Sequence, residues 1–319
     1  MRCQTCGEKA VINMRQHKLA LCKSHFLDWV PEQVERSIKR YHMFTRQDRL
    51  LIAVSGGKDS LSLWDILNRL GYSADGLYIG LGIDRGVNYS ENSLGYALAF
   101  ASDRNLTLHV FDVKNQYGET IPELTARSQR GRYKPCSVCG LTKRHVMNQL
   151  ARSQGYTALL TGHNLDDEAA ILFGNTLSWS GSYLIRQGPV LEADRLGLVR
   201  KVKPLCRMYE REMTAYALLR PIPYIQEECP YAYDSTSIYY KELLNKLEAD
   251  RPGAKLSFYL TFLQAKRNGL FSEAIDTHVE LMHSCPNCGQ STSAPGLCAF
   301  CRMFIKTDFQ QAFDERDEL

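Results

Sequence analysis

The stretch LLIAVSGGKDS, residues 50–60, places an apolar run directly before a glycine pair and a polar segment that opens a helical pattern. The run at 50–54 predicts a buried strand. Gly56 and Gly57 let backbone N–H groups approach a ligand closely, and the N-terminus of the following helix adds a partial positive charge. We therefore expect this turn to bind phosphate, with Lys58 adding a full charge. An ordinary Gly-Gly turn is the alternative for the stretch taken alone.

Short apolar runs recur along the middle of the chain, and helical periodicity fills the intervals between them. The runs predict strands at 50–54, 76–83, 106–111, 157–161 and 199–205. The periodic segments predict helices at 60–70, 90–104, 140–154, 165–178, 208–220, 237–250 and 255–268. This alternation indicates an α/β fold with a doubly wound parallel sheet, which binds ligands at the carboxyl ends of its strands. The segment 181–189 lacks periodicity and predicts a loop near the site.

Composition limits the classes of protein. The 319 residues carry a net charge of +4, and the pI of about 8.4 lies below the range typical of strongly basic nucleic-acid binders, so any RNA contact must come from local patches. No apolar stretch approaches the ~18 residues that span a bilayer, and the N-terminus has no signal-peptide core. We expect a cytoplasmic protein that binds no membrane. Thiols stay reduced there, so the eleven cysteines indicate metal binding or catalysis rather than disulfides.

Paired cysteines at both ends of the chain predict two zinc ribbons, because two CxxC turns can close a tetrahedron around Zn²⁺. The expected ligands are Cys3, Cys6, Cys22 and His25 at one end, and Cys285, Cys288, Cys298 and Cys301 at the other. His25 stands where a fourth cysteine would complete its set. We expect an N-terminal zinc finger at 1–30, a catalytic domain at 31–270 and a C-terminal zinc finger at 271–319.

Four cysteines remain in the middle of the chain. Cys136 and Cys139 form a third CxxC pair that no second pair follows, and Cys229 lies ninety residues further on, after a strand-like segment at 222–226. If these three thiols meet, one coordination position stays open, which suits a reactive metal site better than a structural one. We expect Cys206 to be a small buried hydrophobic residue.

SGGKDS after the first strand resembles the pyrophosphate loop of the PP-loop ATPases, which have the adenine nucleotide alpha-hydrolase-like fold and adenylate their substrates. The resemblance extends to CSVCGLTKR at 136–144, TGHNLDDEA at 161–169, RMYEREMTAYALLRPIPYIQEECPY at 207–231 and both zinc ends. Together these motifs resemble the tRNA 2-thiouridine synthetases of the TtuA and cytosolic thiolation class. That resemblance implies that ATP adenylates the O2 of a tRNA uridine and that sulfur then displaces AMP, which gives 2-thiouridine.

The resemblance also implies roles for particular residues. The ATP-binding candidates are Ala53, Ser55, Gly56, Gly57, Lys58, Asp59, Ser60 and Gly162. The catalytic candidates are Lys58, Asp59, Lys143, Asp166 and Asp167, of which the aspartates would hold Mg²⁺ or orient ATP. Positive charge and Mg²⁺ would stabilise the departing pyrophosphate. Cys136, Cys139 and Cys229 would ligate a 4Fe-4S cluster with one iron free for sulfide. Persulfide chemistry without a cluster is the alternative.

Expected partners are tRNA, a sulfur donor and, from the resemblance alone, a second copy of the chain. The donor stays open between sulfide, a persulfide and a ubiquitin-like thiocarboxylate. Besides the zinc ends, two basic stretches are candidate tRNA contacts, because guanidinium and ammonium groups pair with phosphates. The first contains Arg127, Arg130, Arg132, Tyr133 and Lys134, and the second contains Arg200, Lys201 and Lys203.

Two other functions stay open, a tRNA 2-thiocytidine synthetase and a non-catalytic RNA-binding scaffold with an ATPase-like core. Paired zinc ends are not expected of the cytidine enzymes, and a scaffold has no chemical need for the complete loop, the aspartates and the three central thiols. The modified uridine, at the wobble or the T-loop position, is also open. A charged fraction of 23% and eleven cysteines give no hyperthermophile signature, which weakly disfavours the T-loop position.

Overall fold

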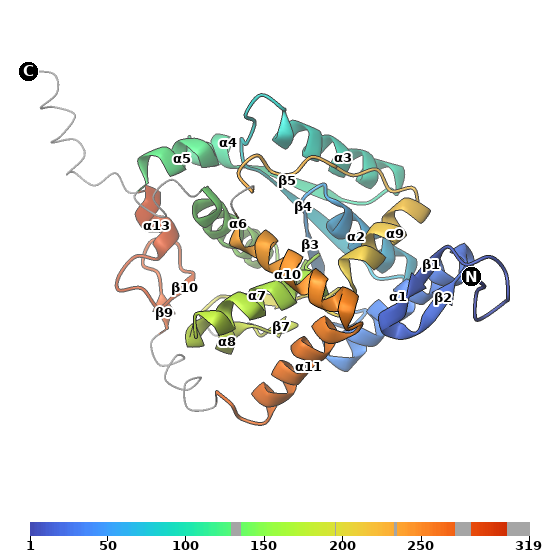
Figure 1. The fold of residues 1–319 in the computed structure, drawn as a ribbon. Helices are drawn as coiled ribbons and strands as arrows, with labels where there is room; N and C mark the ends of the chain where they lie inside the picture. The colour runs from blue at the N-terminus through green and yellow to red at the C-terminus, as the bar shows by residue number, and fades with distance from the viewer. Residues whose placement is uncertain (129–134, 195, 233–234, 272–281, 305–319) are drawn as a thin grey trace, which may run out of the picture.

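The computed structural model describes residues 1–128, 135–194, 196–232, 235–271 and 282–304. A six-stranded sheet forms the centre of this part of the chain, in the order β5-β4-β3-β6-β8-β7 (Figure 1). The strands are β3 Leu50–Val54, β4 Ala74–Gly80, β5 Leu108–Asp112, β6 Ala158–Thr161, β7 Val190–Leu191 and β8 Arg200–Val202. All neighbours pair in parallel except β7, which is an antiparallel edge strand. The predicted doubly wound α/β fold is confirmed.

The strand order reverses beside β3. The chain passes from β3 to β4 and β5 on one side and then returns to β6 on the other side of β3. Strands that diverge in this way leave a crevice at their carboxyl ends, where open α/β sheets bind ligands. The SGGKDS loop leaves β3 at this edge, so the topology puts the loop at the switch point.

Both faces of β3 are buried, as expected of a central parallel strand. Leu50 and Ile52 pack in one hydrophobic core with Trp64, whereas Leu51 packs in a second core with Val146. Trp64 belongs to α2, Lys58–Arg69, and Val146 belongs to α6, Pro135–Ser153. Helices therefore cover both faces of the sheet.

Every helix predicted from periodicity is present, with ends shifted by at most a few residues. Besides α2 and α6 they are α3 Tyr89–Asp103, α7 Leu165–Leu177, α9 Glu210–Leu219, α10 Thr236–Asp250 and α11 Ala254–Arg267. Short helices α4 Val113–Tyr117 and α5 Ile121–Arg127 follow β5. In the described part of the chain, no helix has the length and apolarity needed to cross a bilayer.

The N-terminal ribbon merges with the central domain through a helix that the sequence patterns did not predict. After β1 Ile12–Met14, the short 3₁₀ turn Arg15–His17 and β2 Leu19–Leu21, α1 runs from Lys23 to Arg40, across the boundary expected at residue 30. Pro31 lies inside α1 and cannot donate the helical hydrogen bond to the Leu27 carbonyl. Arg69 Nη1 donates to that carbonyl instead, at 2.7 Å.

Two other expectations were wrong. The predicted loop at 181–189 begins with a short helix, α8 Gly181–Arg186, and it is anchored because Leu184 and Gln187 are buried. The strand-like segment at 222–226 does not join the sheet. It runs irregularly instead, and the Ile225 N–H donates to the Gly56 carbonyl at 3.0 Å. This bond ties the segment to the phosphate loop.

The C-terminal ribbon consists of β9 His283–Ser284, β10 Ser291–Thr292 and α13 Ala299–Phe304. It packs against α6, where the Phe300 ring stacks on His145 at 3.6 Å between centroids and Gln290 Nε2 donates to the His145 carbonyl at 3.0 Å. Residues 272–281 and 305–319 of the expected C-terminal domain lie outside the described residues. Figure 1 shows the two ribbons at opposite ends of the molecule.

Candidate active site

The phosphate loop depends on a glycine in the left-handed region. Gly56 has φ of +73°, and a Cβ atom there would lie 2.2 Å from the Ser93 carbonyl oxygen of α3. Gly57 is the N-cap of α2, and the Ser60 hydroxyl donates to its carbonyl at 3.0 Å. The Ser55 N–H donates to the same hydroxyl oxygen at 3.2 Å. These hydrogen bonds hold the loop in a compact turn.

We expect Gly56→Ala to weaken ATP binding by about tenfold or more and to lower Tm, because the methyl group would force the loop away from α3. Calorimetric titration with ATP and thermal unfolding would measure both effects. Gly95→Ala is the matched control, since Gly95 is helical and a Cβ there meets no atom within 4 Å. Normal ATP affinity in Gly56→Ala would show that the loop tolerates the methyl group.

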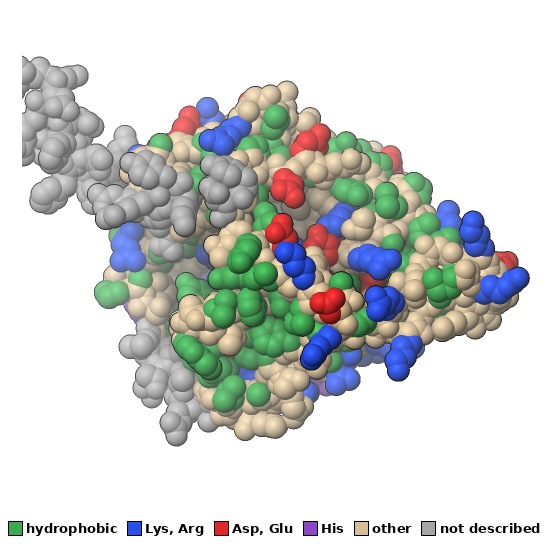
Figure 2. All heavy atoms as spheres, in the orientation of Figure 1, with side chains coloured by type: hydrophobic (Ala, Val, Ile, Leu, Met, Phe, Trp, Pro, Cys, Tyr) green, Lys and Arg blue, Asp and Glu red, His purple; other side chains and the backbone are tan. Residues whose placement is uncertain are grey.

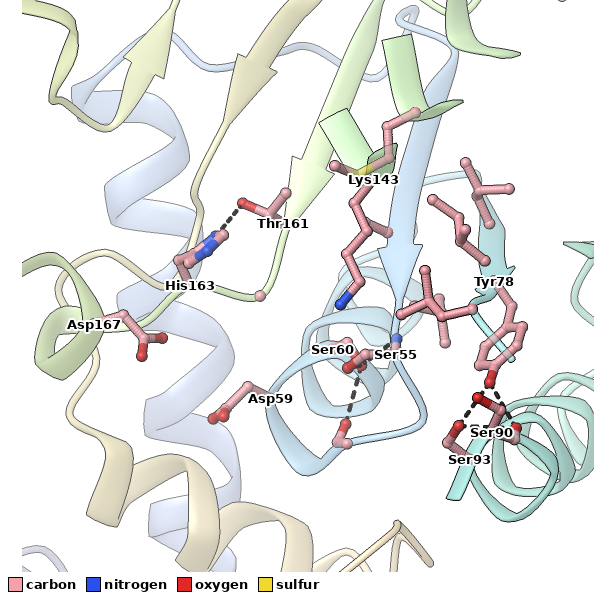
Figure 3. Close-up of a pocket in the computed structure, with 18 of the residues that line it drawn as sticks. Ser55, Asp59, Ser60, Tyr78, Ser90, Ser93, Lys143, Thr161, His163 and Asp167 are labelled. Carbon is pink, nitrogen blue, oxygen red and sulfur yellow. Dashed lines mark hydrogen bonds between the residues drawn. The ribbon is translucent and has the colours of Figure 1, made fainter. Parts of the chain in front are cut away.

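A cavity of about 400 Å³ opens at the carboxyl ends of the central strands. This volume is within the range of ligand pockets in proteins. Its lining combines the apolar side chains of Leu77, Ile79 and Met147 with Tyr78, the phosphate loop and polar residues at the end of β6. Figure 3 shows Tyr78 and Asp167 on opposite sides of the loop. The Tyr78 hydroxyl donates to the Ser90 carbonyl at 2.7 Å. A cavity that combines a phosphate loop with apolar side chains suits a nucleotide.

Alternating charges border the cavity beside the loop. Lys58 Nζ lies 3.0 Å from Asp59 Oδ2 and 2.8 Å from Glu210 Oε1. Lys241 Nζ lies 2.6 Å from Asp167 Oδ1 and 3.2 Å from Glu210 Oε2. Burial alone would lower the pKa of Lys58, but the carboxylates of Asp59 and Glu210 outweigh it and raise that pKa. Both lysines therefore stay charged.

One carboxylate oxygen of Asp59 has no partner in the part of the chain that the structure describes. Asp59 Oδ1 is buried and has no hydrogen-bond partner among the described residues. Burial raises the pKa of Asp59 to about 6, although the Lys58 ammonium opposes the shift. Unpaired buried oxygens are costly in a folded protein and are common where a ligand completes the site. Asp59 and Asp167 lie on the same side of the loop (Figure 3), and carboxylate oxygens are the ligands that Mg²⁺ prefers.

The structure separates the two neighbouring aspartates. Asp167 lines the cavity and belongs to the first turn of α7, where its N–H donates to the Asn164 side chain at 3.1 Å. Asp166 is buried on another side, pairs with Lys255 and accepts from the Glu210 N–H at 2.9 Å. Successive helical residues point about 100° apart, so only one of them can face the nucleotide. The arrangement leaves Asp166 with a structural role.

The other predicted site residues lie at or beside the cavity. Its lining includes six of the eight ATP-binding candidates, namely Ala53, Ser55, Gly57, Asp59, Ser60 and Gly162. Gly56 and Lys58 belong to the same loop but do not line the cavity. Lys143 lines it from α6, and its ammonium points inward (Figure 3).

Several residues that line the cavity were not predicted from the sequence as site residues. Thr161 is the last residue of β6 and His163 lies two residues further on, and the Thr161 hydroxyl lies 2.8 Å from His163 Nδ1. Burial lowers the pKa of His163 to about 4, so its ring is neutral at physiological pH. Their position at the end of a predicted strand was a usable signal, because carboxyl ends of parallel strands share one edge. Ser90 and Ser93 carried no such signal, since only the packing of α3 brings them to the cavity.

The second basic stretch, Arg200, Lys201 and Lys203, does not form the surface expected from sequence. Lys203 pairs with the buried Glu168 at 2.7 Å, and Arg200 pairs with Glu192. Lys201 lines the cavity instead. The prediction that these three residues share one basic surface patch was therefore wrong. Arg127 is engaged by Glu119 and the Met303 carbonyl. Arg130, Arg132, Tyr133 and Lys134 lie outside the described residues. Figure 2 shows basic side chains interspersed with acidic ones around the centre of the face in view.

The three central thiols lie near enough for their charges to interact with one another and with Lys143 and Tyr89 of the cavity lining. None of them lines the cavity, and their sulfurs do not gather within 4.8 Å as the terminal sets do. Cys136 and Cys139 lie one turn apart at the start of α6, and the Cys136 thiol donates to the Tyr231 carbonyl at 3.6 Å. Burial raises the pKa of Cys229, and the charges of Cys139 and Cys136 raise it further, whereas Lys143 lowers it. Cys229 lies four residues after Ile225, whose N–H donates to the Gly56 carbonyl of the phosphate loop. This bond holds the chain segment that carries Cys229 near the loop.

Cys206 lies apart from every cluster, as expected. It is fully buried in the first core, and burial raises its pKa to about 12. All eleven cysteines belong to the described residues and are free thiols.

The N-terminal ligand set has the spacing of a tetrahedral metal site. The Cys6 and Cys22 sulfurs are 3.7 Å apart, and His25 Nδ1 lies 3.2 Å from the Cys22 sulfur and 3.6 Å from the Cys3 sulfur. Zn–S bonds of about 2.3 Å at tetrahedral angles separate two sulfurs by about 3.8 Å. His25 therefore occupies the position expected of a fourth ligand.

The C-terminal set has the same geometry. Cys288 and Cys298 sulfurs are 3.7 Å apart, and the four ligand atoms lie within 4.8 Å of one another. Backbone N–H groups of Cys298 and Cys301 donate to the sulfurs of Cys285 and Cys298 at 3.3 and 3.4 Å. Such bonds favour the thiolate form that binds metal.

The parallel sheet, the glycine loop at its switch point and the charged cavity define a PP-loop ATPase. Residues 30–234 match the family described as PP-loop domain, and residues 2–27 match the family described as 2-thiouridine synthetase TtuA, N-terminal LIM domain. The chain belongs to the TtuA family of tRNA 2-sulfurtransferases.

Two curated relatives cover nearly the whole chain. A Thermus thermophilus protein named tRNA-5-methyluridine(54) 2-sulfurtransferase is 49% identical over 305 residues, which are 95% of this chain and 91% of the relative. A Thermotoga maritima protein of the same name is 40% identical over 95% of this chain and 96% of the relative. A solved structure, the U34-tRNA thiolase NcsA from Methanococcus maripaludis with its 4Fe-4S cluster, has a TM-score of 0.73 and 23% identity, and covers 83% of this chain and 87% of that one. At this identity the likeness shows the fold.

Proposed function

We propose that this protein adenylates the C2 oxygen of 5-methyluridine at position 54 of tRNA and then replaces that oxygen with sulfur. The observation that supports the proposal is a cavity lined by the phosphate loop and Lys143, with three thiols whose charges reach one another and lining residues of that cavity. A carbonyl oxygen is a poor leaving group until AMP is attached, so adenylation and sulfur transfer must occur at the same carbon. A site that joins phosphate-binding and sulfur-bearing groups meets that requirement.

The T-loop position is supported by the relatives. Two enzymes named for position 54 are 40% and 49% identical to this chain, whereas the U34 thiolase is 23% identical. Amino-acid composition weakly favoured the wobble position, because the chain lacks the composition typical of hyperthermophile proteins. Whole-chain identity outweighs that argument, since substrate choice depends on particular contacts and not on bulk charge.

In this proposal the chain's own groups perform the first step. Ser55, Gly57 and Ser60 bind the phosphates, and Lys58 stabilises the charge that develops as pyrophosphate leaves. Asp59 and Asp167 would hold Mg²⁺, and the unpartnered Asp59 Oδ1 supports that assignment. Bound Mg²⁺ would polarise phosphoryl oxygens.

Cys136, Cys139 and Cys229 would hold a 4Fe-4S cluster in the second step. Three cysteines and no fourth leave one iron open, and a bound cluster would supply a coordination site for sulfide. Lys143 lies one helical turn beyond Cys139 and points into the cavity. We assign it to orienting the adenylated uridine beside the thiols. Persulfide chemistry on the same thiols is the competing pathway.

The terminal sets would each hold one structural Zn²⁺. The tetrahedral spacing supports this, and metal binding would supply folding free energy that such short segments cannot gain from a core. We also propose a cytoplasmic homodimer. Molar mass by light scattering would test the dimer.

We expect Cys288→Ser to lower the zinc content by about one ion per chain, because three thiolates do not close the tetrahedron. Binding of tRNA should weaken, because this ribbon is a candidate tRNA contact, while ATP should still bind, because no described residue of the ribbon lines the cavity. Metal analysis and filter binding would measure these effects. Cys206→Ala is the control and should keep both zinc ions. An anaerobically purified wild-type protein without zinc would contradict the assignment at both ends.

Nucleoside analysis tests the proposed function. Anaerobic protein, ATP, Mg²⁺ and sulfide are incubated with tRNA carrying 5-methyluridine at position 54, and in parallel with tRNAs in which U54 or U34 is replaced by cytidine. We expect 2-thiolation to disappear only with the U54 replacement. Loss only with the U34 replacement would assign the wobble position, and 2-thiocytidine would assign the cytidine reaction. Absence of tRNA-dependent ATP/pyrophosphate exchange would favour a scaffold.

A further inference from the structure

Lys201 lines the cavity but has no role in the adenylation and sulfur-transfer steps proposed above. It lies on β8 in register with Leu159 of β6, whose side chain packs in the core on the α6 side of the sheet. Side chains alternate along a strand, so Arg200 and Val202 point to the other face. Lys201 therefore enters the cavity from the same side as Lys143.

The Lys201 ammonium has no hydrogen bond or ion pair among the described residues. Its neighbour Lys203, two residues further on, binds both carboxylate oxygens of Glu168 at 2.7 and 2.8 Å. Both Glu168 oxygens are therefore occupied by Lys203, and Glu168 forms no ion pair with Lys201. Lys201 is half-buried in the lining of the cavity. An ammonium that faces a cavity without a carboxylate partner is available to an anionic ligand.

The surroundings of Lys201 are positive. Burial, together with the charges of Lys203 and Arg144, lowers the pKa of Lys201 to about 8, against a smaller opposing effect of Glu168. The charged or titratable groups around this part of the cavity are Arg200 and Lys203 of β8, Lys143 and Arg144 of α6, and His163, Asp167 and Glu168 at the start of α7. Asp167 already pairs with Lys241, and His163 is neutral. This part of the cavity is thus prepared for an anion.

We propose that Lys201 is a further nucleotide-binding residue, whose ammonium binds a phosphoryl oxygen of ATP and of the AMP group that leaves. The proposal rests on the assignment of this cavity to ATP. The phosphate loop supplies N–H groups from β3, and Lys201 supplies a charge from the opposite side of the switch point, at β8. A phosphoryl group between them would be held from both sides while pyrophosphate and then AMP depart.

Phosphate binding should raise the pKa of Lys201, because a nearby anion favours the charged ammonium. With a pKa of about 8 in the free protein, roughly half of the Lys201 side chains are neutral at pH 8. AMP binding should therefore take up about half a proton at pH 8, little at pH 7 and close to one at pH 9. Asp59, with a pKa of about 6, is ionised over this range and adds nothing.

Calorimetric titration with AMP tests this, in two buffers that differ in ionisation enthalpy. Lys201→Met should abolish the uptake and weaken AMP binding by about tenfold, the effect expected for one charge-assisted hydrogen bond. Lys201→Arg should keep the affinity within a few fold but abolish the uptake, since its guanidinium does not titrate. Arg200→Met, on the same strand and paired with Glu192, is the matched control and should behave as wild type.

Adenosine, which lacks the phosphoryl group, should bind wild type and Lys201→Met equally. Proton uptake that persists in Lys201→Met, or equal AMP affinity in the two proteins, would overturn the assignment of Lys201. If Lys201→Met does not fold, uptake in Lys201→Arg equal to that of wild type has the same meaning. Failure of wild type to bind AMP or ATP at all would instead refute the adenylation site.

Discussion

Replacing Cys229 with serine is expected to abolish thiolation while adenylation continues. Cys229 is the one member of the proposed cluster site that does not come from α6, and its position depends on the bond from Ile225 to the Gly56 carbonyl. Serine keeps the shape of the side chain but removes the thiolate that binds iron. ATP and the uridine O2 react without sulfur, so exchange of pyrophosphate into ATP should survive.

Anaerobic reconstitution measures this result. Wild type should gain about four irons per chain and a broad charge-transfer absorption, and Cys229→Ser should lose both together with 2-thiouridine formation. Cys206→Ala is the matched control, because that buried thiol lies apart from the site, and it should keep cluster and activity. Full activity of iron-free wild type under strictly anaerobic conditions, with a trapped Cys–S–S adduct, would contradict the cluster assignment and support persulfide chemistry.

Lys58→Ala should lower adenylation by ~100-fold or more, the effect of removing one preorganised group that stabilises developing charge. Lys58 bridges Asp59 and Glu210, so its ammonium is already fixed beside the loop when ATP arrives. The fold should remain intact, because Glu210 keeps its pair with Lys241. tRNA-dependent ATP/pyrophosphate exchange measures the rate, and thermal unfolding checks the fold.

Lys39→Ala provides the comparison for this variant. Lys39 lies on α1, and its ammonium pairs with Glu35 on the surface, so its removal should leave exchange unchanged. Exposed pairs of this kind contribute about 1 kcal/mol or less to stability. Near-normal thiolation by Lys58→Ala would remove Lys58 from the phosphate site.

Local patterns predicted much of the fold. The apolar run 50–54 coincides with β3, Leu50–Val54, and α7 and α10 begin and end within one residue of the predicted helices. These elements can be predicted from the sequence because hydrophobic periodicity reflects burial over a few residues. The zinc sets were equally accessible, since a CxxC turn brings two sulfurs together without help from distant residues.

The helix α1 shows where local rules failed. Pro31 predicts the end of a helix, yet α1 continues to Arg40. Phe26, Val30 and Val34 are completely buried, and the Leu27 carbonyl is satisfied by Arg69, forty-two residues away in the sequence. The burial and the distant donor offset the lost helical bond. Neither is visible in a sequence window.

The sequence by itself determined the class of chemistry, because SGGKDS, the CSVC pair and the terminal cysteines carry their function in residue type and spacing. Only the tertiary structure decided which side chains share the cavity. In the tertiary structure Asp167 faces the cavity, Asp166 pairs with Lys255 and Glu168 pairs with Lys203, whereas Lys201 has no partner among the described residues. These choices depend on helix phase, strand register and partners far along the chain. Neighbouring residues of the same type can therefore differ completely in role.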